Sequence, residues 1–306
     1  MKILVILTGG TIGSVIHDGY IYTDEDAKKL VVDNYLTEYN NDVEFEILEP
    51  FTLHSEYLSY KEINSLVDIV CDSISKDYDG IIVTHGTDSL QFSASALSFA
   101  VGNCNIPVLM VSAQYPMADY RSNGQINFNG AVEFIKNKKG TGVYVAYAND
   151  NENVNFHQGN RVIMFNEADD KVYSLPPVNV NSALGKYELT ENSKTLVITV
   201  SPGAVYNYDL EGIKAIILRP YHSGTVNIKS QDFLVFVGEA KQKNIPVYLV
   251  NLKKGVNYEG VREYEKAGID ILPFCSFPSI YMKSWIGNSI ECDFNEFMKT
   301  PIAGEF

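Results

Sequence analysis

Two glycine turns that carry threonines are the parts of this sequence best suited to chemistry. Residues 8–14 read TGGTIGS and residues 84–89 read THGTDS. A threonine hydroxyl can act as a nucleophile, and backbone amides in a glycine turn can hold an oxyanion. A carboxylate such as that of Asp88 can assist proton transfer. Together the two turns favour a hydrolytic site built around a hydroxyl group.

Other uses of such residues are weaker here. A glycine turn after a first strand often cradles a phosphate, but residues 8–14 lack the GxGxxG spacing and no GK[ST] follows. The Thr87-Asp88 pair could equally cap a helix. The histidines form neither HExxH nor another paired spacing, so we expect no metal site. They stand at positions 17, 54, 85, 157 and 222. No GxSxG segment of a serine hydrolase is present.

The surrounding sequence predicts elements that would bring both turns together. Short apolar runs at 3–7, 80–83, 107–111 and 143–148 are typical of buried parallel strands. The acidic stretch at 23–26 predicts a helix start, and Ser59 with Glu62 predicts a capping box. Such alternation favours an α/β fold with a parallel sheet, in which ligands bind at the carboxyl ends of the strands.

The chain is expected to form two domains. Residues 1–175 would form the larger, flavodoxin- or Rossmann-like domain that carries the catalytic threonines. Residues 176–194 are rich in Pro, Asn and Ser and would form a linker. Strand-like and helical segments resume after it, so residues 195–306 would form a smaller α/β domain. Strands are expected there at 195–200, 215–218, 247–250 and 269–272, with helices at 231–243 and 259–267.

Composition excludes several kinds of partner. The 306 residues include 38 acidic and 24 basic ones, a formal net charge of -14 that disfavours nucleic acid and anionic membrane surfaces. No targeting signal is expected at the amino terminus, and no apolar run approaches a membrane span. The scattered cysteines predict reduced thiols in a cytoplasmic protein. They are residues 71, 104, 275 and 292.

These motifs resemble the two signatures of bacterial-type asparaginases and glutaminases. Residues 121–127 (RSNGQIN) are similar to the RSDGQIN segment of the cytoplasmic type I members. Residues 159–161 (GNR) and 218–221 (LRPY) resemble two further family segments in the same order. The resemblance therefore spans nearly the whole chain and weakens over the last 30 or so residues. It implies an amidohydrolase without a cofactor or metal, assembled as a homodimer or homotetramer.

The resemblance also implies roles for single residues. Thr11 would be the nucleophile, and Tyr20 would lie on the loop that closes over the site. Thr87 and Asp88 would form the second catalytic group. The substrate would be bound by the glycine turns and by the segment that follows a strand expected at 43–48; these residues are Gly10, Ser55, Glu56 and Gly86. Family members commonly carry Ser-Asp or Ser-Gln where this chain has Ser55-Glu56.

One departure from the family concerns catalysis. Relatives carry a lysine three residues after the GNR turn, where this chain has Met164. Methionine cannot transfer a proton, and a lost acid–base group costs about 10²–10⁴-fold in rate. Lys171 or Lys283 could substitute, the substrate could be another amide or a peptide, or the protein could be a non-catalytic binding or regulatory homologue. Residues 277–285 also lack the acid that relatives often place there for a neighbouring subunit. Our first hypothesis is hydrolysis of L-asparagine or a related amide to a carboxylate and ammonia.

Overall fold

The computed structural model describes residues 1–39, 43–150, 152–163, 169–251 and 258–306. The chain divides into two compact units. The first comprises residues Met1–Tyr187 and Ile302–Gly304, and the second comprises Glu188–Pro301 and Glu305–Phe306. The first unit thus includes the early part of the segment expected to be a linker. In the described part of the chain, no helix is long and apolar enough to cross a membrane.

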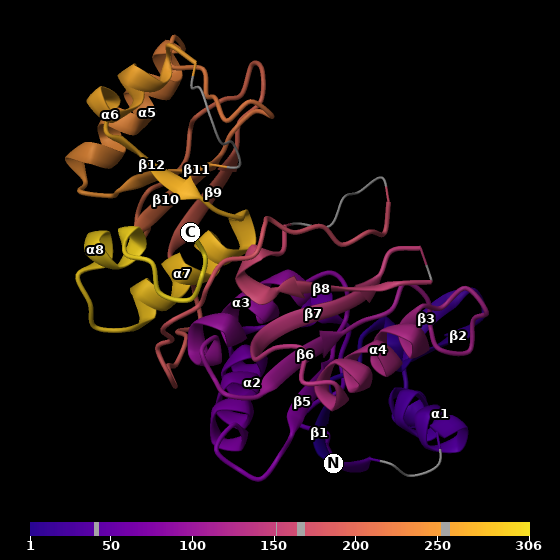
Figure 1. Cartoon of the computed structure of the whole chain (residues 1–306). Coiled ribbons are helices and arrows are strands. Elements are labelled where there is room, and N and C mark those ends of the chain that lie inside the picture. The colour runs from indigo at the N-terminus through magenta and orange to yellow at the C-terminus, as the bar shows by residue number, and fades with distance from the viewer. Residues whose placement is uncertain (40–42, 151, 164–168, 252–257) are drawn as a thin grey trace. The chain divides into compact units, whose positions relative to one another are not determined.

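A six-stranded sheet forms the centre of the first unit, in the order β4-β1-β5-β6-β7-β8 (Figure 1). All neighbouring strands are parallel except β7 and β8. The predicted α/β fold with a parallel sheet is therefore confirmed. The strands are β1 (Lys2–Leu7), β4 (Glu44–Leu48), β5 (Gly80–Thr84), β6 (Pro107–Val111), β7 (Gly142–Ala148) and β8 (Val154–Gln158).

Helices cover both faces of this sheet. They are α1 (Leu30–Tyr39), α2 (Tyr60–Ser73), α3 (Leu90–Val101) and α4 (Gly124–Lys136). One apolar cluster joins alternate residues of β1 to α1 and α4, while α2 and α3 pack against each other (Figure 1). The predicted capping box is confirmed, because the Ser59 hydroxyl accepts from a backbone amide of α2 and Glu62 accepts from the Ser59 amide.

The crossover that precedes α4 has an unusual hand. The steps from β5 to β6 and from β6 to β7 run in the same direction across the sheet. Their helices nevertheless lie on opposite faces, because α4 shares the apolar cluster of α1 and α3 does not. The step from β1 to β4 runs the other way, with α1 on the face of α4, so it has the same hand as the connection through α3. The connection through α4 has the opposite, left-handed sense, which is rare for parallel strands. The long loop between β6 and α4 contains the first three residues of the RSNGQIN segment, and α4 contains the other four.

A small hairpin stands at the start of the chain. It pairs β2 (Ser14–His17) with β3 (Tyr20–Thr23) in antiparallel register. Its turn is Asp18-Gly19, whose φ angles of 51° and 81° suit the tight turns of two-residue hairpins. The helix start expected at 23–26 is wrong in position. The Asp24 carboxylate there accepts from the Asp26 and Ala27 amides, just before and at the start of the 3-10 helix η2 (Ala27–Lys29), and α1 begins only at Leu30.

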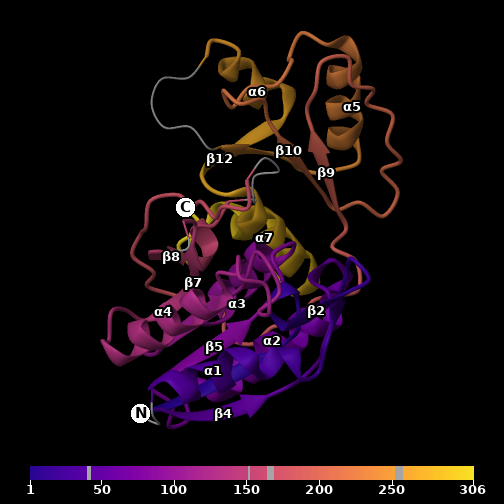
Figure 2. The same ribbon diagram turned by 90° about the vertical axis from the view of Figure 1, so that its right-hand side faces the viewer.

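The second unit has its own four-stranded parallel sheet, in the order β12-β11-β10-β9. Its strands are β9 (Thr195–Thr199), β10 (Ala215–Arg219), β11 (Val247–Asn251) and β12 (Ile269–Phe274). Its helices are α5 (Gln231–Gln242), α6 (Val261–Ala267), α7 (Phe277–Ser289) and α8 (Phe294–Lys299). Figure 2 shows α5 and α6 together on this sheet, where they enclose a separate apolar core. The strands and the first two helices confirm the expected segments; α7 and α8 were not predicted.

Candidate active site

The first glycine turn directly follows β1, an interior strand of the parallel ladder between β4 and β5. Residues Thr11–Gly13 form the 3-10 helix η1. Two backbone contacts fix the turn: the Gly10 amide donates to the Leu53 carbonyl at 2.9 Å, and the Ser14 hydroxyl donates to the Gly10 carbonyl at 2.7 Å. Thr11 is half-buried and is therefore presented to the space beyond the strand end.

The two glycine turns approach each other as closely as their backbones allow. A Cβ atom on Gly10 would lie 2.3 Å from the Gly86 nitrogen, and Gly10 has a φ of 71°. A Cβ atom on Gly86 would lie 2.4 Å from the Ser55 hydroxyl oxygen. Only glycine fits at both positions, because a larger residue would clash with backbone or with Ser55. The expectation that the turns share one crevice is thus met at Gly10 and Gly86.

A cavity of about 310 Å³ opens at this meeting point. It contains most of the expected site residues together with some that the sequence did not suggest. Its lining consists of Gly10, Thr11, Ile21, His54, Ser55, Glu56, Tyr57, Gly86 and Asp88. Tyr20 and Thr87 do not line it: the Tyr20 side chain is 69% exposed on the hairpin, and Thr87 is half-buried beside the cavity. The hairpin instead contributes Ile21, the residue after Tyr20.

The hydroxyl of Ser55 is a polar group poised for a ligand. Ser55 is only 5% exposed, and its Oγ has no hydrogen-bond partner among the described residues. Buried hydroxyls are normally satisfied, so an unpartnered one at a cavity wall indicates a place for a ligand or water. Its backbone is fixed, since the Ser89 hydroxyl donates to the Ser55 carbonyl at 2.7 Å.

Two carboxyl groups meet in the cavity. Burial, and then the charge and hydrogen bond of Glu56, raise the pKa of Asp88 above its usual value. The residues that line the cavity include no lysine or arginine. The site therefore has acidic character, and it suits a substrate that carries an ammonium group.

His85 supports the second turn. Its side chain is 1% exposed, and burial lowers its pKa to about 4, so it is neutral at neutral pH. The ring Nδ1 lies 2.8 Å from the Gly86 carbonyl, which can only accept, so Nδ1 carries the proton. This bond fixes the peptide next to Thr87 and Asp88. His85 therefore supports the turn that presents Thr87.

The other expected segments have structural contacts. In the RSNGQIN segment, Asn127 donates to the Ser112 carbonyl at 2.8 Å and accepts from the Ala148 amide at 2.7 Å. In the GNR turn, Asn160 donates to the Ala303 carbonyl and Arg161 donates to the Pro176 carbonyl. These contacts fix the loops beyond β6, β7 and β8. Met164 lies outside the described residues.

Neither alternative lysine is placed in this cavity. Lys171 is exposed and does not line it. Lys283 belongs to the second unit, where its buried ammonium binds the Glu305 carboxylate and the Thr300 carbonyl. The described residues also contain no cluster of three or more His, Cys, Asp or Glu side chains that could hold a metal ion.

Three of the lining residues escaped the sequence analysis. His54 and Tyr57 flank Ser55-Glu56, and their rings form an edge-to-face pair with centroids 6.3 Å apart. Their proximity to Ser55 in the sequence was the available signal. Ile21 is brought in by the hairpin, and the Asp-Gly turn at 18–19 was a signal for that hairpin. Histidine, tyrosine and isoleucine all recur along this chain, so residue type alone does not single out these three.

Comparison with known proteins points to one family. A profile described as "Asparaginase, N-terminal" matches residues 2–179. L-asparaginase 1 of Escherichia coli (strain K12) is 29% identical over 281 residues, which span 82% of this chain and 79% of that protein. The L-asparaginase of Thermococcus kodakarensis is 26% identical over 299 residues, which span 88% of this chain and 87% of that protein.

Solved structures agree with the fold. The structure of the thermostable L-asparaginase from Thermococcus kodakarensis has a TM-score of 0.78 and 25% identity, and the alignment covers 100% of this chain and 99% of that one. L-asparaginase I from Vibrio cholerae has a TM-score of 0.80 at 23% identity, with 99% of this chain and 98% of that one covered. The second comparison supports the fold alone. With more than half of its length matched by the family profile, the chain belongs to the asparaginase family.

Proposed function

We propose that this protein hydrolyses the side-chain amide of L-asparagine, or of a closely related amide, to a carboxylate and ammonia. The observation that carries the proposal is the cavity in which the Thr11 turn faces Ser55, Glu56 and Asp88. It combines a hydroxyl nucleophile, an unpartnered buried hydroxyl and an acidic wall in one place. The family membership and the relatives named L-asparaginase give the same reaction.

In the proposed reaction, the Thr11 hydroxyl oxygen attacks the amide carbonyl carbon. The C–N bond breaks, the nitrogen takes up the hydroxyl proton, and ammonia leaves an ester between the substrate acyl group and Thr11. Water then hydrolyses the ester, which releases the carboxylate and restores the hydroxyl. Backbone amides of the two glycine turns would stabilise the oxyanion. No cofactor is required.

The acidic wall would orient the substrate. Glu56 and Asp88 would bind its α-ammonium group, because two carboxylates beside the cavity attract a cation. Ser55 would donate its hydroxyl to the α-carboxylate, which gives the buried Oγ the partner that it lacks. Tyr20 and Thr87 would act from outside the lining, Tyr20 when the hairpin closes and Thr87 through the turn that it shares with Asp88.

Ammonia release from L-asparagine, L-glutamine and an asparagine-containing peptide tests the proposed reaction. We expect release from free L-asparagine by the native protein, and faster release after Met164→Lys restores the lysine that relatives carry. Release from the peptide alone would replace this substrate with a peptide amide. No release from any of the three, before or after Met164→Lys, would favour a binding or regulatory role and contradict the proposal.

We also propose that the chain forms a homodimer or homotetramer and works in the cytoplasm, where its cysteines would stay reduced. Light scattering of the purified protein should then give two or four times the chain mass of 34.1 kDa. A monomer at micromolar concentration would contradict the proposed assembly. Cell fractionation tests the location.

A further inference from the structure

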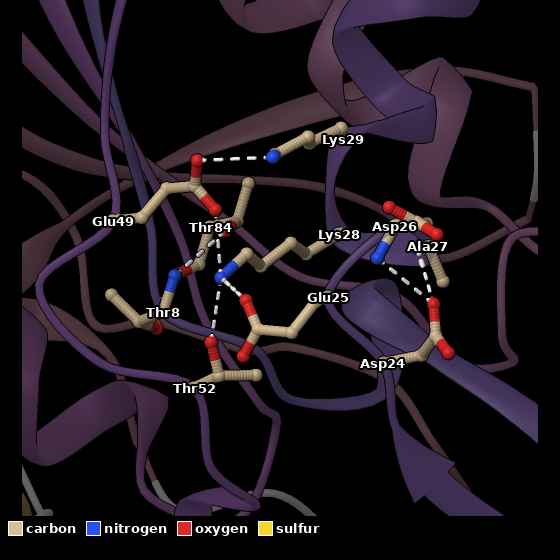
Figure 3. A network of polar contacts seen from close by, with 10 residues as sticks. All are labelled: Thr8, Asp24, Glu25, Asp26, Ala27, Lys28, Lys29, Glu49, Thr52 and Thr84. Atoms are coloured by element: carbon tan, nitrogen blue, oxygen red, sulfur yellow. Dashed lines mark hydrogen bonds and ion pairs between the residues drawn. The ribbon is translucent and has the colours of Figure 1, made fainter.

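Lys28 is a buried cation beside the candidate site, and the proposed reaction does not use it. Its side chain is 2% exposed, although lysines are rarely buried unless they are paired. The ammonium group binds the Glu25 carboxylate, the Glu49 carboxylate at 2.8 Å and the Thr52 hydroxyl at 2.7 Å (Figure 3). Three oxygen partners thus match the three protons of the ammonium group.

The partners of Lys28 come from two different segments. Lys28 and Glu25 belong to the stem that follows β3, at the base of the hairpin that carries Tyr20. Glu49 and Thr52 belong to the loop between β4 and the 3-10 helix η3 (Ser55–Tyr57). The loop leads directly into four consecutive residues of the cavity lining, His54 to Tyr57. Lys28 therefore joins the hairpin base to the substrate loop, which we define as residues 49–53.

The hairpin base is also packed against the first glycine turn. The Asp24 amide donates to the Gly13 carbonyl at 3.1 Å, which closes the two ends of the hairpin. A Cβ atom on Gly13 would lie 2.8 Å from the Cβ of Lys28. Lys28 is thus in contact with the turn that presents Thr11. A shift of its side chain would disturb the hairpin base and the Thr11 turn together.

The substrate loop is held from its other side by the strand end. The Leu53 amide donates to the Thr8 carbonyl at 3.2 Å, and the Gly10 amide donates to the Leu53 carbonyl. These bonds fix only the last residue of the loop. At its start the loop depends on the ion pairs of Glu49, and in its middle on the bond from Lys28 to Thr52. Lys28 therefore supplies the side-chain contact that completes the support of this loop.

The charges of the cluster are balanced, so Lys28 stays ionised. Burial opposes its charge, yet the hydrogen bonds to Glu25 and Glu49 raise the pKa of Lys28 above the usual value. The hydrogen bond from Lys28 in turn lowers the pKa of Glu49. Lys29 adds a second contact to Glu49 at 3.2 Å, but its side chain is 41% exposed. Both lysines thus contact the Glu49 carboxylate: Lys28 from the buried side and Lys29 from the solvent side.

We propose that Lys28 is a positioning residue of the active site, which clamps the base of the β2–β3 hairpin to the substrate loop. The clamp fixes the position of Ser55 and Glu56 relative to Thr11. It also fixes the base of the hairpin, about which Tyr20 moves. This assignment rests on the proposed function for its kinetic consequence. The clamp itself is a physical property of the chain and can be measured without any substrate.

The test compares Lys28→Met with Lys29→Met. Methionine keeps the length and apolar stem of lysine but removes the ammonium group, and both variants take one cation from Glu49. Thr52→Val removes the hydroxyl at nearly constant volume and breaks only the bond to the loop. We expect Lys28→Met to raise KM for L-asparagine by about tenfold with a much smaller change in kcat, because Ser55 and Glu56 are then no longer held in position to bind the substrate. Lys29→Met should leave both constants unchanged.

Combining the Lys28 and Thr52 substitutions in one protein distinguishes a specific clamp from a general loss of stability. Thr52→Val should raise KM in the native background and have no further effect in Lys28→Met, since the bond is already gone. Amide hydrogen exchange tests the clamp without any enzymatic activity. The backbone amides within 14–23 and 49–53 should exchange faster in Lys28→Met than in Lys29→Met. If native protein releases no ammonia, the proposed function fails, and hydrogen exchange still decides the clamp. Equal exchange in the two lysine variants, or additive effects of Lys28→Met and Thr52→Val, would overturn it.

Discussion

At the scale of single residues, the contact between Asp88 and Glu56 has the clearest chemical consequence. Burial, together with the neighbouring Glu56 carboxylate, raises the pKa of Asp88. The proposed reaction needs the ionised Asp88 side chain to bind the substrate ammonium group. A raised pKa means that this form is lost at a higher pH than for an ordinary aspartate. As the pH is lowered, activity should therefore begin to fall at a higher pH than it would with an ordinary aspartate.

Glu56→Gln should shift that acidic limb. Glutamine keeps the length of the side chain but removes the charge that disfavours ionised Asp88, so the pKa of Asp88 should fall. We expect the acidic limb of kcat/KM for ammonia release to move to lower pH, although KM rises because one carboxylate is lost. Glu44→Gln, on the exposed amino end of β4, is the matched control. A limb that stays in place, or moves to higher pH, would disprove this link between Glu56 and Asp88.

The sequence predicted several polar residues of the cavity but not the rest of its lining. Thr11 and Asp88 stand in signature motifs and Ser55 was expected from the resemblance, and all three line the cavity. The pKa of Asp88 depends on how near Glu56 lies, and no spacing in the sequence contains that distance. His54, Tyr57 and Ile21 fill space around the ligand, a role that many residue types share. Lys28 was missed because two of its three partners, Glu49 and Thr52, lie on a segment distant in sequence.

At the scale of elements, buried asparagines hold together the loops that follow β6 and β7. Asn127 is fully buried in α4, where its side chain donates to Ser112 and accepts from Ala148. One side chain thus satisfies a backbone group just after β6 and another in the last residue of β7, as buried polar groups require. The left-handed connection that ends in α4 places this helix where it can reach both.

Asn127→Ala should destabilise the protein by about 2–4 kcal/mol, because it leaves buried backbone groups without partners and opens a small cavity. Asn137→Ala at the exposed end of the same helix removes only solvent-facing bonds to Glu133 and should cost about 0.5 kcal/mol. Urea unfolding followed by circular dichroism measures both. Equal losses of stability in the two variants would show that Asn127 makes no special contribution.

The sequence predicted the order of strands and helices well but not how they connect in space. Apolar runs identified the strands of the large sheet, and the Ser59-Glu62 capping box placed the start of α2. The acidic run at 23–26 does not open α1: the Asp24 carboxylate accepts from the Ala27 amide at the start of a 3-10 helix, and α1 begins at Leu30. Charge at a helix start is a preference of only a few tenths to about 1 kcal/mol, and a nearby turn can use the same residues. The face on which α4 packs depends on the whole sheet and has no local signal.

At the scale of the whole molecule, each unit has a core of its own. The second unit also contains a fully buried ion pair, in which Lys283 binds Glu305 near the end of the chain. Burial lowers the pKa of Lys283, and the Glu305 carboxylate opposes this effect. A buried pair of this kind contributes little net energy when intact, but losing one partner leaves an uncompensated charge.

Lys283→Met should therefore lower the free energy of unfolding of the second unit by about 3–5 kcal/mol. Trp285 is the single tryptophan of the chain and lies in α7 of this unit, so its fluorescence reports the transition. Lys299→Met removes an exposed pair with Asp270 at 2.9 Å and should cost at most about 1 kcal/mol. Adding Glu305→Gln to Lys283→Met should restore part of the loss. Similar losses for the two lysine variants would contradict the role of the buried pair.

The measurement that tests the central claim most directly is ammonia release from L-asparagine by Thr11→Val and Thr11→Ser beside the native protein. Valine matches the shape of threonine but has no hydroxyl, while serine keeps the nucleophile. We predict that Thr11→Val loses at least about 10³-fold in kcat and that Thr11→Ser keeps measurable turnover. Turnover by Thr11→Val within about tenfold of the native rate would contradict the account, because the hydroxyl of Thr11 would then not be the nucleophile.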